Sequence, residues 1–155
     1  MIKKPRSYEL QEKEYLALAE FRYQIRRFLR HMESEVAGSG LNPQQYQLLL
    51  AIKGLPKGRE STITALAERL QLNHNTMVEL VDRCQEKGLT RRQRSAEDRR
   101  HVVISLTAQG EAFLQKLASA ARRELHQIGP ILVNAMKQLA PLGLKHKGAT
   151  GAEQR

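Results

Sequence analysis

The fold is decided by residues 64–107, which read TALAERLQLNHNTMVELVDRCQEKGLTRRQRSAEDRRHVVISLT. Thr64 can cap a short helix over residues 65–71, because its hydroxyl can accept a hydrogen bond from an unpaired amide of the first turn. Asn73 can cap a second helix, which runs to Lys87, in the same way. Two short helices joined by a tight turn are typical of a helix-turn-helix.

The residues that follow change to the spacing of strands. In residues 101–106, every second side chain is apolar, as in a strand with one covered face. Residues 89–93 form a weaker strand that can pair with it. The polar and charged connection, residues 94–100, then forms the tip of a β-hairpin. Together with the two helices, this hairpin predicts a winged helix-turn-helix.

A further helix is expected before this unit. Asn42 followed by Pro43 predicts its start, because a cap acceptor precedes a residue that has no amide hydrogen. Its buried face is predicted to hold Tyr46, Leu49 and Leu50.

Long amphipathic helices are expected at both ends of the chain, and Gly129-Pro130 is expected to break or bend the second. A small central unit cannot cover their apolar stripes, so a symmetric homodimer is the simplest solution. We therefore expect a mainly α protein with a small β-hairpin wing. Its parts are dimerisation helices at 8–37 and 108–140, a winged helix-turn-helix DNA-binding domain at 41–107, and a disordered tail at 141–155.

Composition narrows the class of partner. The 155 residues carry a formal net charge of +10 and no tryptophan, which favours duplex DNA over a stacked single strand. The single cysteine excludes an internal disulfide, and no apolar run approaches the ~20 residues needed to cross a bilayer. The N-terminus lacks the apolar core of a secretory signal. We therefore expect a cytoplasmic protein with no membrane partner.

The second helix of the helix-turn-helix carries the candidate residues for base recognition. Short polar side chains on its first turns could reach base edges in the major groove, although the same residue types are common at any solvated helix start. The candidates are Asn73, His74, Asn75, Thr76, Glu79 and Arg83.

Residues 91–101 crowd five arginines onto the hairpin. Such a run is usually a solvated face, but beside a helix-turn-helix a wing arginine can enter the minor groove. The wing candidates for DNA contact are Arg92, Arg94, Ser95, Asp98, Arg99 and Arg100.

An ordered series of motifs runs through the predicted winged helix-turn-helix. They are LAERL at 66–70, LVDR at 80–83, EKGL at 86–89, RS at 94–95, EDRR at 97–100 and ISLT at 104–107, followed by Gly110. In these motifs the sequence resembles the MarR family (multiple antibiotic resistance regulators), and the resemblance covers most of residues 10–140. It implies a homodimer whose terminal helices pair and whose two winged helices read a pseudo-palindromic operator.

The resemblance also assigns roles to single residues. Arg100 matches the family arginine that enters the minor groove, and Asp98 matches the acid that helps to orient it. Arg92 matches an arginine that often pairs with an acid at the start of the recognition helix. That position is Asn73 here, so the resemblance does not supply the partner of Arg92.

Many proteins of this family release DNA when a small phenolic or anionic effector enters a crevice beside the dimerisation helices. The residues that could line such a crevice are Phe21, Arg22, Tyr23, Arg26 and Tyr46. An equally good interpretation places Phe21 in the core and the arginines in solvent. No cofactor or metal is expected, because the histidines show no ligand spacing, and Cys84 has the inward spacing of a small buried hydrophobe.

These patterns predict a DNA-binding transcriptional regulator, in the main interpretation a repressor released by a small molecule. The alternative is a winged-helix protein-interaction module whose basic wing meets an acidic partner and binds DNA without sequence preference. No phosphate loop, metal-binding pair or nucleophile motif indicates an enzyme.

Overall fold

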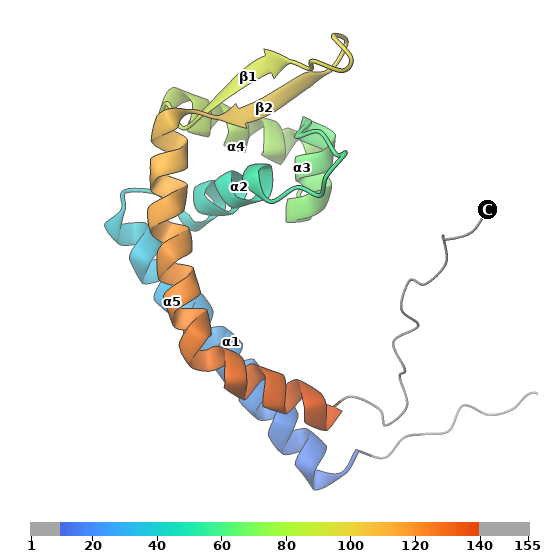
Figure 1. Cartoon of the computed structure of the whole chain (residues 1–155), viewed down its shortest axis with the longest axis vertical. Coiled ribbons are helices and arrows are strands. Elements are labelled where there is room, and N and C mark those ends of the chain that lie inside the picture. Colours follow the sequence, from blue (N-terminus) through green and yellow to red (C-terminus); the bar gives the residue numbers. More distant parts are fainter. Residues whose placement is uncertain (1–9, 140–155) are drawn as a thin grey trace, which may run out of the picture. The chain divides into compact units, whose positions relative to one another are not determined.

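The structure is a computed structural model that describes residues 10–139. The contacts divide the chain into two compact units, one of residues 28–125 and one formed by the residues up to 27 and from 126. The predicted fold class, mainly α with a two-stranded hairpin, is confirmed (Figure 1). In chain order, the elements are α1 (Glu12–Gly38), α2 (Pro43–Lys53), α3 (Ile63–Leu70), α4 (His74–Glu86), β1 (Thr90–Arg94), β2 (Val102–Leu106) and α5 (Ala108–Leu139).

The helix-turn-helix consists of α3 and α4. The α3 cap is Thr62, whose hydroxyl accepts the Ala65 amide at 3.2 Å, so the expectation that Thr64 caps this helix is wrong. The turn after α3 places Gln71 in the left-handed region at φ 55°. Asn73 caps α4 as predicted, because its side-chain oxygen accepts the Thr76 amide at 2.8 Å.

Helix α2 begins at the predicted cap. The Asn42 side chain accepts the Gln45 amide, and the Gln45 side chain accepts the Asn42 amide in return. Tyr46 and Leu49 are buried as expected, but Leu50 is 45% exposed, so that part of the prediction is wrong. The buried face continues instead through Leu48, since Leu50 lies about 100° further round the helix than Leu49.

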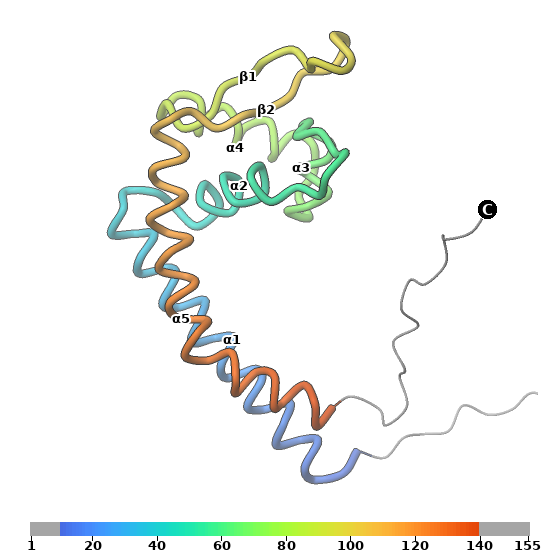
Figure 2. The backbone as a smooth tube through the Cα atoms, viewed as in Figure 1, coloured from blue at the N-terminus to red at the C-terminus, as the bar shows by residue number. Residues whose placement is uncertain are grey.

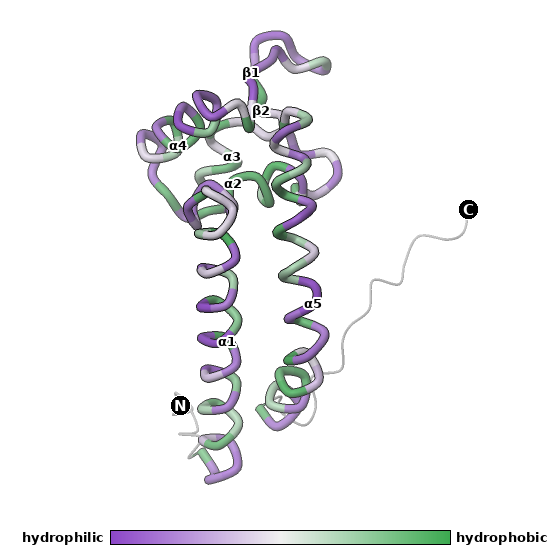
Figure 3. Tube along the Cα trace, turned by 90° about the vertical axis from the view of Figure 1, so that its left-hand side faces the viewer, coloured by the Kyte–Doolittle hydropathy of each residue, from purple (hydrophilic) through white to green (hydrophobic). Residues whose placement is uncertain are grey.

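The wing is an antiparallel hairpin in which Thr90 pairs with Leu106 and Arg94 pairs with Val102 (Figure 2). Its strand β1 begins one residue later than predicted. On β2, Ile104 is buried, whereas Val102, at the tip end of the strand, is 41% exposed. The hydrophobic core therefore reaches to the middle of β2, and the wing is largely hydrophilic (Figure 3).

One hydrophobic cluster holds the larger unit together. Its fully buried members come from the end of α1, from α2, α3 and α4, from the residue before β1, from β2 and from the first half of α5. Burial of each large apolar side chain stabilises the fold by roughly 1.5–3 kcal/mol. The fully buried members include Leu48, Leu49, Leu66, Met77, Leu80, Leu89, Ile104 and Leu117. The two helices of the helix-turn-helix are thus fixed by packing as well as by caps.

Helix α5 starts against the base of the wing. The Thr107 hydroxyl accepts the Gly110 amide at 3.1 Å and donates to the Gly88 carbonyl. The sequence predicted that Gly129-Pro130 would break or bend this helix. The helix continues through Pro130, so it is not broken there. A proline removes one backbone hydrogen bond, and the turns on either side of Pro130 still form theirs.

The smaller unit combines the first part of α1 with the last part of α5. Ala17 and Ala135 are buried in it, whereas Leu16, Val133 and Met136 are at least half exposed. The expected tail at 141–155 lies outside the described residues. None of the helices within residues 10–139 is long and apolar enough to cross a membrane.

Candidate nucleic-acid interface

The first turn of α4 presents polar side chains to solvent. Asn73, His74 and Asn75 are exposed, and Thr76 is half-buried. The Asn73 oxygen is occupied by the cap, so His74 and Asn75 are the side chains of this turn with the most freedom to contact a ligand. Further along, α4 buries one face in the core (Met77, Leu80, Val81 and Cys84). The helix is thus anchored along one side and free at its N-terminal turn.

Glu79 and Arg83 form an exposed ion pair one turn apart on α4. The Arg83 guanidinium lies 3.4 Å from the Glu79 carboxylate, and both side chains are more than half exposed. Such a pair contributes little to stability. Arg83 could therefore exchange this contact for a phosphate at small cost.

Arg92 has a partner that the sequence did not reveal. Its guanidinium donates to Asp82 at 2.5 Å and to Gln85 at 2.9 Å, both in the second half of α4. The acid partner of Arg92 is therefore not at the start of α4. These two hydrogen bonds connect β1 to α4 and reduce the freedom of the Arg92 side chain to contact a ligand. No local spacing connects Asp82 to a residue ten positions later.

Arg100 is held by Asp98 through two parallel hydrogen bonds. Arg100 Nε lies 3.1 Å from Asp98 Oδ1, and Nη2 lies 2.8 Å from Oδ2. The Asp98 carboxylate also accepts the Arg100 amide at 3.0 Å. These hydrogen bonds hold the pKa of the Asp98 carboxyl below its usual value and raise the pKa of the Arg100 guanidinium. With its side chain 88% exposed, Arg100 is oriented and still open to an anion.

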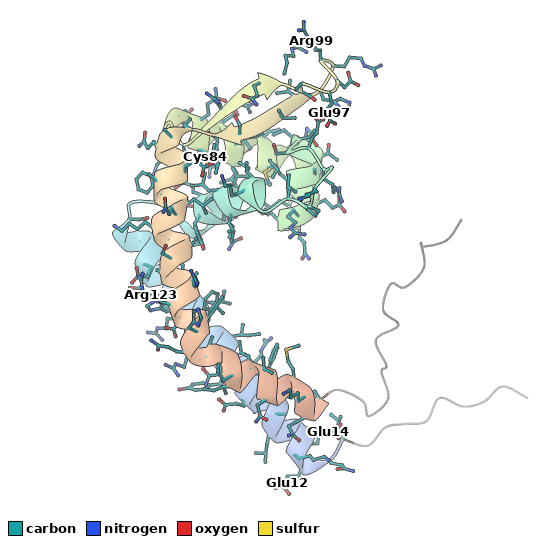
Figure 4. The ribbon with its side chains drawn as sticks, in the orientation of Figure 1. Glu12, Glu14, Cys84, Glu97, Arg99 and Arg123 are labelled. Atoms are coloured by element: carbon teal, nitrogen blue, oxygen red, sulfur yellow. The ribbon has the colours of Figure 1, made fainter. Side chains whose placement is uncertain are left out.

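The other wing arginines differ in how far they are held. Arg94 donates to the Arg99 carbonyl at 3.0 Å and so closes the turn of the hairpin. Arg99 lies at the tip, where its side chain points away from the hairpin (Figure 4). Both are exposed, and their charge adds to the attraction for phosphates.

Ser95 is the buried member of the wing candidates. Its hydroxyl accepts the amides of Glu97 and Asp98 at 3.1 Å each and donates to the carboxylate of Glu60. His101 Nδ1 lies 3.6 Å from the second oxygen of the same carboxylate. Glu60 and His101 were missed by sequence reasoning, because Glu60 lies 35 positions before Ser95 in a loop with no periodic signal. Ser95 therefore organises the wing and is not open to a ligand.

The candidate effector residues fall in different units. Phe21 is half-buried, whereas Arg22, Tyr23 and Arg26 are exposed on α1. Tyr46 is buried in the larger unit, where burial raises the pKa of its hydroxyl. The crevice and its effector stay a prediction.

Cys84 is fully buried within α4 (Figure 4). Burial raises the pKa of its thiol to about 11, with a smaller opposing effect from the charge of Lys87. A thiol that stays neutral at pH 7 is a poor nucleophile.

The chain matches one family model. Residues 39–101 match the model of the MarR family, a segment that contains α2, α3, α4, β1 and the turn of the wing.

Curated relatives are transcriptional regulators by name. The chain is 28% identical over 105 residues to the HTH-type transcriptional regulator PapX of Escherichia coli, covering 67% of this chain and 63% of PapX. It is 35% identical over 71 residues to the organic hydroperoxide resistance transcriptional regulator of Bacillus subtilis (strain 168), covering 46% of this chain and 48% of that protein. The chain thus spans less than two thirds of the length of these relatives.

The fold also matches solved structures. One is a mutant of S. aureus MepR bound to an oligodeoxyribonucleotide, with a TM-score of 0.60 and 19% identity over 85% of this chain and 100% of that one. At this identity the match concerns the fold.

Proposed function

We propose that this chain is a sequence-specific regulator of transcription that binds double-stranded DNA. The premise is that the chain belongs to the MarR family through residues 39–101. The observation that carries the binding of duplex DNA is Arg100. It lies on a hairpin wing next to a helix-turn-helix, is oriented by two hydrogen bonds to Asp98 and keeps its side chain 88% exposed. A guanidinium held in this way suits the narrow, negative minor groove.

Sequence preference is assigned to the first turn of α4. His74 and Asn75 are exposed there, and an asparagine can bind an adenine edge through two hydrogen bonds. The wing and this turn thus have different roles in DNA binding. The wing binds any duplex through charge, and the turn distinguishes bases.

We propose that the chain forms a homodimer with a second identical chain. In the smaller unit, Leu16, Val133 and Met136 are at least half exposed, and exposed large apolar side chains favour a protein interface. A two-fold dimer would present two recognition helices to half-sites about 34 Å apart, one turn of DNA. The operator is then pseudo-palindromic.

Regulation is proposed to follow from that spacing. A small phenolic or anionic effector, bound beside Arg22, Tyr23 and Arg26, would favour a dimer in which the recognition helices no longer match one turn of DNA. The protein would then act as a repressor that the effector releases in the cytoplasm. The family consists of regulators, and no catalytic role is proposed.

The experiment is a selection of binding sites from a random 24-base-pair library with the purified full chain. We expect an inverted repeat with half-sites one helical turn apart to be enriched. A pool that stays random after several rounds would contradict the proposal. It would favour the alternative, a winged-helix module for an acidic protein partner.

A further inference from the structure

The wing is fastened to a segment far from it in the sequence. Ser95, at the start of the turn, is 2% exposed, and its hydroxyl accepts the amides of Glu97 and Asp98. The same hydroxyl donates its proton to the carboxylate of Glu60. All the hydrogen-bonding capacity of this hydroxyl is thus used inside the protein.

Glu60 is itself held in place by its backbone. It lies in the loop between α2 and α3, where its carbonyl accepts the Thr62 amide at 2.9 Å. The next residue, Ser61, pairs with β2, because its carbonyl accepts the Ile104 amide at 2.9 Å and its hydroxyl donates to the Ile104 carbonyl. The Glu60 carboxylate therefore reaches the turn of the wing from a loop that is fixed beside the middle of β2.

The contact continues to the exposed arginine. The Asp98 amide is bound by Ser95, and the Asp98 carboxylate holds the Arg100 guanidinium. Glu60 thus reaches Arg100 through two intermediate residues without touching it. A second Glu60 oxygen lies 3.6 Å from His101 Nδ1, on the residue that ends the turn.

The negative charge of Glu60 allows an electrostatic role of this residue to be distinguished from a positioning role. An acid near bound DNA repels phosphates, so simple electrostatics predicts that its removal would strengthen binding. A positioning role predicts the opposite sign, because the turn that carries Arg100 would lose its support.

We propose that Glu60 is the positioning residue of the wing, and that it acts through Ser95 and Asp98 to hold Arg100 for DNA. The predicted effect of Glu60 on DNA binding rests on the proposed function. The predicted effect of Glu60 on the order of the turn does not depend on that function.

Three variants test the proposal. Glu60→Ala removes the acceptor, Glu60→Gln keeps an oxygen that can accept the Ser95 proton, and Glu97→Ala is the matched control. Glu97 is an exposed acid of the same turn, and among the described contacts only its amide takes part in the Ser95 network. Thermal unfolding checks that each variant folds. If Glu60→Ala does not fold, Glu60→Ser replaces it, because it also removes the carboxylate that accepts the Ser95 proton.

The first readout is amide hydrogen exchange of the free protein, followed by nuclear magnetic resonance. Loss of one well-formed hydrogen bond corresponds to about a tenfold change. We expect the Asp98 amide to exchange about tenfold faster in Glu60→Ala and close to the wild-type rate in Glu60→Gln and Glu97→Ala. An unchanged exchange rate in Glu60→Ala would overturn the proposal, whatever the protein does with DNA.

The second readout is the affinity for the duplex that the wild-type chain selects from the random library. We expect Glu60→Ala to bind about tenfold more weakly, Glu60→Gln to recover most of the affinity, and Glu97→Ala to bind equally or more tightly. Tighter binding by Glu60→Ala would show that Glu60 acts only through its charge. If the wild-type chain selects no duplex, the proposed function is contradicted. The hydrogen-exchange rates still show in that case whether Glu60 orders the turn.

Discussion

Arg100 and Asn75 carry different parts of the proposed recognition, and the difference lies in their chemistry. Arg100 is a fixed, exposed charge, whereas Asn75 is a neutral side chain with both a donor and an acceptor. A charge attracts phosphates of every sequence, and an amide distinguishes base edges. The two residues should therefore respond differently to the same truncation.

We expect Arg100→Ala to weaken binding to all duplexes by about tenfold or more and to reduce the slope of log affinity against log salt by about 1. We expect Asn75→Ala to lower affinity for the selected duplex and to change the order of preference among single-base variants of it. Fluorescence anisotropy titrations at several salt concentrations measure both effects. Equal losses for both variants on every duplex would count against this division.

Cys84 allows a separate prediction about pH. Since burial raises its thiol pKa from 9.0 to about 11, the folded state holds the proton more tightly than the unfolded state. Its contribution to stability is thus present below pH 9 and is lost as pH rises toward 11. At about pH 8 we expect a thiol reagent to label the folded protein far more slowly than the urea-unfolded chain. Similar labelling rates would mean that the thiol is accessible in the native state.

At the scale of elements, local chemistry explains which predictions succeeded. Asn42 and Asn73 cap their helices through residues three positions away, so each cap is visible in a short stretch of sequence. Thr62 and Thr64 are equally good caps by sequence. The start of α3 at Ile63 agrees with the pairing of neighbouring Ser61 with Ile104, a contact between residues 43 positions apart.

The contacts of the candidate site also differ in how far apart their residues lie in the sequence. Arg100 and Asp98 are two residues apart and were paired through the family resemblance. The acid partners of Arg92 and Ser95 could not be predicted, because Asp82 and Glu60 come near them only when the hairpin folds against α4 and the loop before α3. Contacts of this kind leave no periodic signal.

Gly110 lies where the first turn of α5 approaches the backbone of Leu89. A Cβ at this position would lie 2.0 Å from the Leu89 carbonyl oxygen, so α5 could not keep its distance from the base of the wing. We expect Gly110→Ala to lower the free energy of unfolding by at least about 2 kcal/mol. Gly129→Ala is the control, because its Cβ would meet nothing within 4 Å in a helix interior. Urea denaturation of both variants checks this, and equal stabilities would contradict the close approach.

At the scale of the whole molecule, the proposed dimer depends on the apolar surface of the smaller unit. Met136 is 57% exposed, and a second copy that covered it would bury it. Placing a charge there would then cost several kcal/mol if the charge stayed unpaired.

We therefore expect Met136→Glu to raise the dissociation constant of the dimer by at least about a hundredfold. Gln127→Glu, an exposed position on the same helix, should change it little. Sedimentation equilibrium measures both constants. A wild-type chain that stays monomeric at micromolar concentration would rule out the dimer, and an unchanged constant in Met136→Glu would move the interface elsewhere.

If this protein recognises a DNA sequence, its affinities for two duplexes of equal composition must differ. The full chain is titrated separately into the duplex obtained by random-site selection and into a scrambled duplex of the same composition, near physiological salt. We expect a preference of at least about a hundredfold for the selected duplex, clear of non-specific binding. Equal affinity for the two duplexes would contradict it.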